Sequence, residues 1–231
     1  KDIRKNDIVI VERAGDVIPH IVSVDIKKRK KNSLKFIFPT KCPSCGSKTI
    51  KEYNSITKKE DSVRRCSKEG FDCEKIAIEK LKHFVSKEAF NIDGFGKKIV
   101  ENFWNLKLIK FPQDIFNLDF NKIEKLEGWG KLSTENLKFS INEKKKISLE
   151  KFIYALGIRH IGLENAKLLA KYFVTYSKFK ELSNNKKYED LLNIDGIGET
   201  QINSIKNFFS NKINLNVLNK LQDILNIQNK L

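Results

Sequence analysis

The four cysteines are the residues whose type and spacing most directly predict chemistry in this chain. Cys42 and Cys45 stand in the segment Cys-Pro-Ser-Cys-Gly. The two intervening residues let both sulfurs face one tetrahedral ion, and the glycine permits a tight turn. Cys66 and Cys73 complete a C-x2-C-x20-C-x6-C pattern. We expect one structural zinc ion here, because four protein ligands leave no open position for water.

Disulfides and separate buried thiols are the alternatives to a metal site. Disulfides are less expected, because the chain opens with charged residues and a strand-like run and shows no secretion signal. His83 is a conceivable replacement for one cysteine, but it lies ten residues after Cys73 in a helical pattern. The chain contains no methionine, so we expect it to be a fragment of a longer protein.

A Gly-X-Gly turn recurs along the second half of the chain. Residues 91–96 read NIDGFG and residues 193–198 read NIDGIG, with KLEGWGKL and ALGIRHIGLENAKLLA between them. The second glycines are Gly96, Gly130, Gly162 and Gly198, at intervals of 34, 32 and 36 residues. The first position of each turn is held by Gly94, Gly128, His160 and Gly196. Such a period indicates an internal repeat.

Apolar residues follow each second glycine at the same helical positions. The pairs four and seven residues on are Val100/Phe103, Thr134/Leu137, Ala166/Leu169 and Ile202/Ile205, and seven of these eight residues are apolar. They share one helical face. The sequence therefore predicts one supersecondary unit used four times: helix, short glycine-bearing hairpin, helix.

The predicted hairpins are suited to holding phosphates. Glycine allows close backbone approach, and a helix that starts there offers unpaired N–H groups to an anion. Lys97 and Lys98 follow the first turn, Lys131 follows the second, and Arg159 with His160 lies in the third. Glu199 and Thr200 follow the fourth turn, which is a weaker candidate.

The net charge of the chain also favours an anionic partner. Lysine and arginine exceed aspartate and glutamate by 45 to 29, a net charge of +16, which favours a nucleic-acid partner. Compositional bias explains the charge equally simply, and a structural turn remains the alternative for any single hairpin. A dinucleotide fingerprint is excluded by the missing preceding strand and third glycine, and a tetratricopeptide array lacks Gly-X-Gly. Phosphate contacts of this kind predict binding independent of base sequence.

The chain divides into three regions with different residue patterns, and together they predict a multidomain α+β fold. Residues 1–38 read as strands, with a hairpin around Arg13–Asp16, a basic run Lys27–Lys31 and a third strand at Leu34–Phe38. Residues 39–75 hold the cysteines, and residues 76–231 are helical by period. The clearest helical segments are residues 74–85, 97–106, 149–156, 164–173 and 200–209. No run of eighteen apolar residues occurs, so no membrane span is expected.

These pieces, in this order, resemble the C-terminal half of bacterial NAD⁺-dependent DNA ligases. The segments that carry the resemblance are ERAGDVIPHIVSV, FPTKCPSCGS, IEKLKHFVSKEAFNIDGFGKKIVENF and ALGIRHIGLENAKLLA. The resemblance implies that residues 1–38 are the later strands of an OB-fold. It makes residues 39–75 a four-cysteine zinc finger and residues 76–231 a helix-hairpin-helix domain.

The resemblance also implies a function. The family seals nicks in duplex DNA during replication and repair, by adenylating a lysine from NAD⁺, passing AMP to the 5′-phosphate and joining the 3′-hydroxyl with Mg²⁺. The implied partner is nicked duplex DNA in the bacterial cytoplasm and nucleoid, bound by a monomer. It makes Arg13, Ala14 and Gly15 candidate DNA contacts beside the four hairpins. NAD⁺ and Mg²⁺ would be bound largely outside these residues.

Three departures from the family pattern limit what is carried over, the first being that the Cys66–Cys73 spacing is one residue longer than the resemblance implies. No Lys-X-Asp-Gly motif occurs, so the adenylation domain is absent, no catalytic residue is assigned, and the chain alone is expected to be inactive. The final BRCT domain is not visible either. The alternatives are a non-enzymatic DNA-repair accessory module built on the same hairpins, or a non-functional remnant of a split ligase gene.

Overall fold

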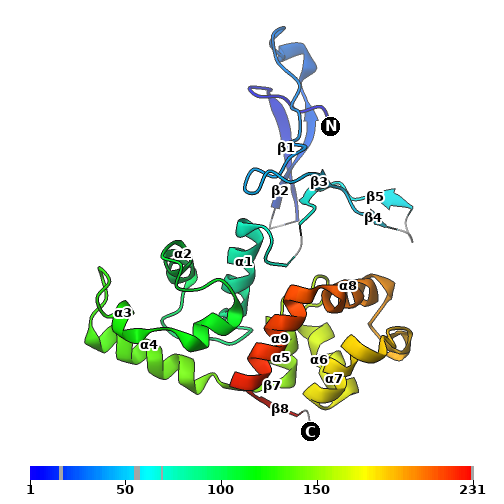
Figure 1. Ribbon diagram of the computed structural model, residues 1–231. Coiled ribbons are helices and arrows are strands. Elements are labelled where there is room, and N and C mark those ends of the chain that lie inside the picture. Colours follow the sequence, from blue (N-terminus) through cyan, green and yellow to red (C-terminus); the bar gives the residue numbers. More distant parts are fainter. Residues whose placement is uncertain (16–17, 55–57, 69, 230–231) are drawn as a thin grey trace. The chain divides into compact units, whose positions relative to one another are not determined.

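The computed structural model describes residues 1–15, 18–54, 58–68 and 70–229, which form two compact units (Figure 1). The first unit comprises Lys1–Ser67 and the second Lys68–Leu231. The expected mixture of small strand pairs, a cysteine cluster and many helices is confirmed. Among the described residues, no helix is both long enough and apolar enough to cross a bilayer.

The first unit is built on an antiparallel hairpin, as the sequence predicts. Strands β1 (Val9–Ala14) and β2 (Ile18–Val24) pair with a register shift between Ile10 and Val11. Arg13 and Ala14 end β1, Gly15 is in the turn at a φ of +65°, and Asp16 lies outside the described residues. Two shorter antiparallel pairs follow: β3 (Thr49–Ile50) with β6 (Arg65–Cys66), and β4 (Tyr53–Asn54) with β5 (Lys59–Glu60).

The predicted third strand at Leu34–Phe38 is wrong. The segment has no strand structure, and Phe36 and Phe38 pack edge to face, with ring centroids 4.8 Å apart, while both remain more than half exposed. The apolar pattern is that of a strand. No described strand hydrogen-bonds to this segment, and a lone extended segment has no ladder to hold it.

The basic run Lys27–Lys31 is not uniformly solvated. It overlaps the short 3-10 helix η1 (Ile26–Lys28), after which Arg29 folds back. Arg29 Nη2 lies 2.8 Å from Asp7 Oδ2, and the Asp7 side chain is 1% exposed. A hydrogen bond from the Arg29 guanidinium, assisted by one from the backbone of Arg4, holds the pKa of Asp7 below its ordinary value. Arg29 therefore stabilises the fold of the first unit through its ion pairs.

The second unit is almost entirely helical, and all five helical segments predicted from periodicity are present. Its helices are α1 (Glu74–Phe84), α2 (Lys97–Asn105), α3 (Phe120–Ile123), α4 (Lys131–Glu143), α5 (Leu149–Ala155), α6 (Leu163–Phe173), α7 (Tyr176–Asn185), α8 (Glu199–Ser210) and α9 (Lys212–Ile224), with 3-10 helices η2 (Pro112–Asn117) and η3 (Glu189–Asn193). Phe84, Phe103, Phe152 and Phe179, each at most 1% exposed, anchor a core that runs through the unit.

The C-terminal segments of the second unit pack against segments from the middle of that unit. Strand β8 (Asn226–Gln228) pairs in parallel with β7 (Lys146–Ser148), and α9 packs against η2. In Figure 1 the red helix α9 ends near β7. These contacts join segments from both halves of the repeat, so its four hairpins belong to one packed body.

Candidate functional site

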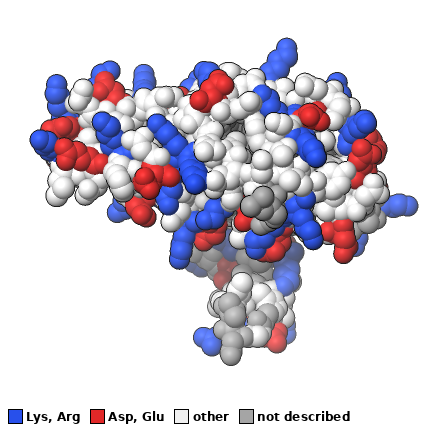
Figure 2. Space-filling model, turned by 90° about the horizontal axis from the view of Figure 1, so that it is seen from below, with Lys and Arg blue, Asp and Glu red and all other residues white. Residues whose placement is uncertain are grey.

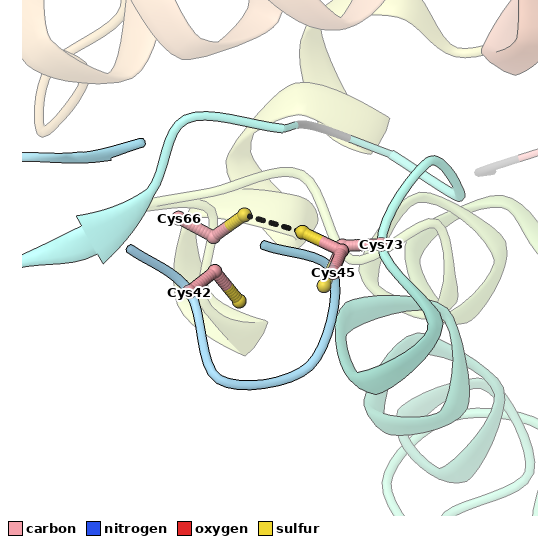
Figure 3. Close-up of side chains that lie close together, drawn as sticks. All are labelled: Cys42, Cys45, Cys66 and Cys73. Carbon is pink, nitrogen blue, oxygen red and sulfur yellow. Dashed lines mark hydrogen bonds between the residues drawn. The ribbon is translucent and has the colours of Figure 1, made fainter. Parts of the chain in front are cut away.

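The four cysteine sulfurs converge as the sequence predicts. All four Sγ atoms lie within 4.8 Å of one another, and Cys45 Sγ is 3.5 Å from Cys66 Sγ (Figure 3). Cys42 and Cys45 lie on one tight turn, closed by a 2.9 Å hydrogen bond from Gly46 N to Cys42 O, with Gly46 at a φ of +71°. Cys66 ends β6, and Cys73 is the residue before α1.

The cluster has the dimensions of a tetrahedral metal site. Zinc–sulfur bonds of about 2.3 Å set sulfurs roughly 3.8 Å apart, within the observed spread. No disulfide joins the cysteines, all of which are described. His83 is not a ligand, since its Nε2 lies 2.7 Å from the backbone oxygen of Tyr154. Four cysteines are therefore positioned to hold one metal ion.

The four Gly-X-Gly turns share one backbone conformation. We call them the first to fourth hairpins, residues 91–96, 125–130, 157–162 and 193–198. The first turn positions Gly94, Gly128, His160 and Gly196 have φ of +77°, +79°, +59° and +89°. The middle residue donates to a carbonyl three residues back in each: Phe95 to Ile92, Trp129 to Leu126, Ile161 to Ile158 and Ile197 to Ile194, at 3.0–3.2 Å.

Each second glycine precedes a helix and accepts its first intrahelical bond. The pairs are Val100 with Gly96, Thr134 with Gly130, Ala166 with Gly162 and Ile202 with Gly198, at 2.9–3.1 Å. All eight residues predicted to share the inner helical face are buried, including the polar Thr134. The repeated unit predicted from the spacing is thus present four times.

The second glycines are not needed by the chain's own packing. A Cβ added at Gly96, Gly130 or Gly162 would meet no atom within 4 Å. Their φ values of −72°, −151° and −79° suit any residue. Nothing inside the protein therefore demands glycine there, which points to the approach of another molecule as the constraint.

The hairpins differ in their backbone amides. The Gly130 N–H donates to Ser133 Oγ at 3.0 Å, and the Gly198 N–H donates to Gln201 Oε1 at 3.2 Å. Within the described part of the chain, no such internal acceptor is recorded for the amides of Gly96 and Gly162. Sequence reasoning missed this difference, although a side-chain acceptor three residues after the cap is a recognised signal.

The predicted cations lie at the expected turns. Lys97, Lys98 and Lys131 are exposed in the first turns of α2 and α4. Arg159 and His160 are exposed in the third hairpin, and His160 Nδ1 lies 3.0 Å from Ser204 Oγ on α8, a partner the sequence did not reveal. Figure 2 shows basic side chains spread among acidic ones over the face in view, without a single continuous patch.

Two tryptophans, one in α2 and one in the second hairpin, have partners inside the protein. Trp129 packs against Phe103, with ring centroids 5.5 Å apart, and Trp104 Nε1 donates to Glu74 Oε1 at 3.0 Å. Both tryptophans are half-buried and pack against the hydrophobic core. Arg13 is exposed at the end of β1, so a DNA role for Arg13, Ala14 and Gly15 stays a prediction.

The sequence matches one protein family and is similar to several known proteins. Residues 151–218 match the helix-hairpin-helix motif family. The chain is 72% identical over 228 residues to the DNA ligase of Pelagibacter ubique (strain HTCC1062), covering 99% of this chain and 34% of that protein. It is 48% identical over 237 residues to the DNA ligase of Ehrlichia chaffeensis (strain ATCC CRL-10679 / Arkansas), covering 98% and 34%.

A third relative, the DNA ligase of Parvibaculum lavamentivorans (strain DS-1 / DSM 13023 / NCIMB 13966), is 43% identical over 233 residues, covering 96% and 32%. The chain thus spans about a third of the length of the curated relatives it matches.

Proposed function

This chain is homologous to part of the DNA ligases over 99% of its own length, and we propose that it forms the DNA-gripping part of an NAD⁺-dependent ligase. In this role it holds the backbone of nicked duplex DNA without reading base sequence. Sealing in replication and repair, with NAD⁺ and Mg²⁺, requires groups that this chain does not supply. We place it, as a monomer, in the bacterial cytoplasm at the nucleoid.

One observation carries the proposal: the second glycines of three hairpins face open space in a backbone conformation that does not require glycine. A phosphate at the start of the following helix would exclude a Cβ and receive backbone N–H groups. The helix-hairpin-helix match and the net charge of +16 support the same ligand.

We assign the hairpins unequal roles. In the first hairpin, Gly94 and Gly96 present the backbone, and Lys97 and Lys98 supply positive charge. In the third hairpin, Arg159, His160 and Gly162 do the same. The Gly130 and Gly198 amides already donate within their own turns, so the second hairpin, with Gly128 and Lys131, adds mainly charge, and the fourth, with Gly196, mainly support.

We further propose that the metal held by Cys42, Cys45, Cys66 and Cys73 is zinc. All-thiolate tetrahedral sites favour that ion, which would crosslink its segment without taking part in the reaction. The family-based division into residues 1–38 (OB-fold), 39–75 (zinc finger) and 76–231 (helix-hairpin-helix) is part of the same proposal. The sulfur separations support the ligand set.

Fluorescence anisotropy with labelled duplexes tests the function. We expect the chain to bind a nicked duplex with an affinity that falls steeply with salt, log Kd changing by about 0.9 per phosphate contact per decade of salt concentration. A duplex of shuffled sequence should bind equally well, because backbone contacts carry no base information. Absence of duplex binding at low salt, or strong preference for one sequence, would contradict the proposal.

A further inference from the structure

The third hairpin is the one in which a side chain replaces the first glycine. His160 occupies that position with a φ of +59°, a conformation that side chains other than Asn, Asp and His seldom adopt. Its backbone oxygen accepts from Asn165 Nδ2 at 3.0 Å, and its ring Nδ1 lies 3.0 Å from Ser204 Oγ. The residue is thus held from its backbone and from its ring, yet it is exposed.

A second hydrogen bond of Ser204 indicates which atom donates. A hydroxyl has one proton, and Ser204 Oγ donates it to Thr200 O at 3.0 Å. Ser204 therefore accepts from His160, whose proton must be on Nδ1. In the neutral ring this leaves the lone pair on Nε2. Because a phosphate oxygen only accepts, the ring donates to a DNA backbone only after Nε2 takes up a proton from solvent. The ring has one tautomer and one orientation because α8 supplies the acceptor.

A second contact joins the same two hairpins. A Cβ added at Gly196, in the fourth turn, would lie 3.0 Å from Leu168 Cδ1 on α6, the helix that follows the third turn. The fourth turn is therefore seated directly on that helix. The packing of Gly196 on α6 and the hydrogen bond between Ser204 and His160 together hold the third hairpin against the fourth hairpin and its helix α8.

We propose that Ser204 is a positioning residue: from the fourth hairpin, it orients His160 of the third hairpin toward the DNA backbone. The inference rests on the proposed function, since it assigns the fourth hairpin a use within the same DNA grip. It accounts for a fourth turn that carries Glu199 and Thr200 where the first carries lysines.

The ring tautomer gives a test that does not involve DNA. The chain has three histidines, so their imidazole nitrogens can be resolved by long-range ¹H–¹⁵N NMR. We expect His160 as the Nδ1–H tautomer, assigned by the signal lost in His160→Asn. His83 serves as an internal reference of opposite type, since its Nε2 faces the carbonyl of Tyr154 and must donate. Ser204→Ala should remove the Nδ1–H preference of His160, and Ser204→Thr should restore it.

Binding to duplex DNA gives the functional test. Ser204→Ala should weaken affinity about fivefold, the loss of one oriented hydrogen bond, and Ser204→Thr should recover most of it. Combined with His160→Asn, Ser204→Ala should cause no further loss, because both changes remove the same contact. Ser210→Ala is the matched control: Ser210 Oγ also bonds four residues back on α8, to Lys206 O at 2.8 Å, without contacting His160.

The outcomes separate this inference from the proposed function. Duplex binding by the unmodified chain with unchanged affinity in Ser204→Ala would overturn the positioning role. An Nε2–H tautomer of His160 in the unmodified chain would overturn it as well. No duplex binding by the unmodified chain would instead overturn the proposed function itself.

Discussion

At the scale of single residues, the glycines of the hairpins are of two kinds. The first of each pair adopts positive φ, which costs an L-residue about 1–2 kcal/mol and explains glycine without any ligand. The second adopts an ordinary extended conformation, and in three of the four turns a Cβ there would meet no atom within 4 Å. His160 shows that the first position tolerates a side chain, whereas the second position is glycine in all four turns.

Gly96→Ala and Gly198→Ala make a matched pair for this distinction. Both should leave the melting temperature nearly unchanged, since neither φ is positive and neither Cβ meets an atom closer than 3.5 Å. Duplex affinity should fall about tenfold at Gly96, because a Cβ there displaces a phosphate from the helix N-terminus, and much less at Gly198.

Anisotropy titrations measure the affinities, and thermal unfolding checks the fold. Gly94→Ala, at a φ of +77°, serves as the opposite control and should lower stability instead. Equal loss of affinity at Gly96 and Gly198 would contradict the unequal roles of the two hairpins.

At the scale of elements, the cysteine segment has little buried structure of its own to hold it. Its strand pairs are two residues long, and Thr49, Gly70 and Cys73 are the only buried residues among the described residues 39–73. A segment with so small a core usually depends on a crosslink. The helical unit, in contrast, has a large buried hydrophobic core.

Removing one ligand should unfold this segment selectively. Cys66→Ser should reduce bound zinc from about one ion per chain to well below that and expose residues 39–73 to protease, since metal binding is coupled to local folding. The helical circular dichroism should persist, because the buried Phe and Leu core lies in the second unit. Metal analysis and limited proteolysis are the measurements.

Ser44 lies between Cys42 and Cys45 and is not one of the clustered ligands. The Ser44→Ala protein should therefore keep both its zinc and its resistance to protease. A Cys66→Ser protein with full zinc content would contradict the four-cysteine site. A zinc-free protein with unchanged protease resistance would contradict its structural role.

At the scale of the whole molecule, the four hairpins share one buried core. Strand β8 returns to β7 and α9 packs against η2, so the repeat is closed upon itself instead of being an open array. The chain holds no Lys-X-Asp-Gly motif. Binding and adenylation are therefore expected to be separable.

Incubation of the 231-residue chain with NAD⁺, Mg²⁺ and nicked duplex should yield no covalent AMP and no sealed product. Mass spectrometry of the protein and denaturing gels of the DNA measure the two outcomes. A complete ligase, such as that of Pelagibacter ubique, is the positive control. An adenylated form of the isolated chain would overturn the assignment of this chain to DNA gripping alone.

Local patterns predicted much of this molecule. The 3.6-residue period identified α1, α2, α5, α6 and α8, and the regular glycine spacing identified all four hairpins with their buried faces. The C-x2-C-x20-C-x6-C spacing identified the four cysteine ligands. Each signal is contained within one element or one repeat, where backbone geometry and side-chain period act together. The predicted strand at Leu34–Phe38 was wrong because strand formation also requires a partner.

What only the tertiary structure decided are the relations between distant residues. The pairing of Arg29 with Asp7 and the contact of Ser204 with His160 both join side chains that are far apart in the chain. No period or spacing encodes such contacts, because they depend on how finished elements pack. The sequence by itself determined that NIDGFG and NIDGIG are the same turn; the fold decided that they have different neighbours.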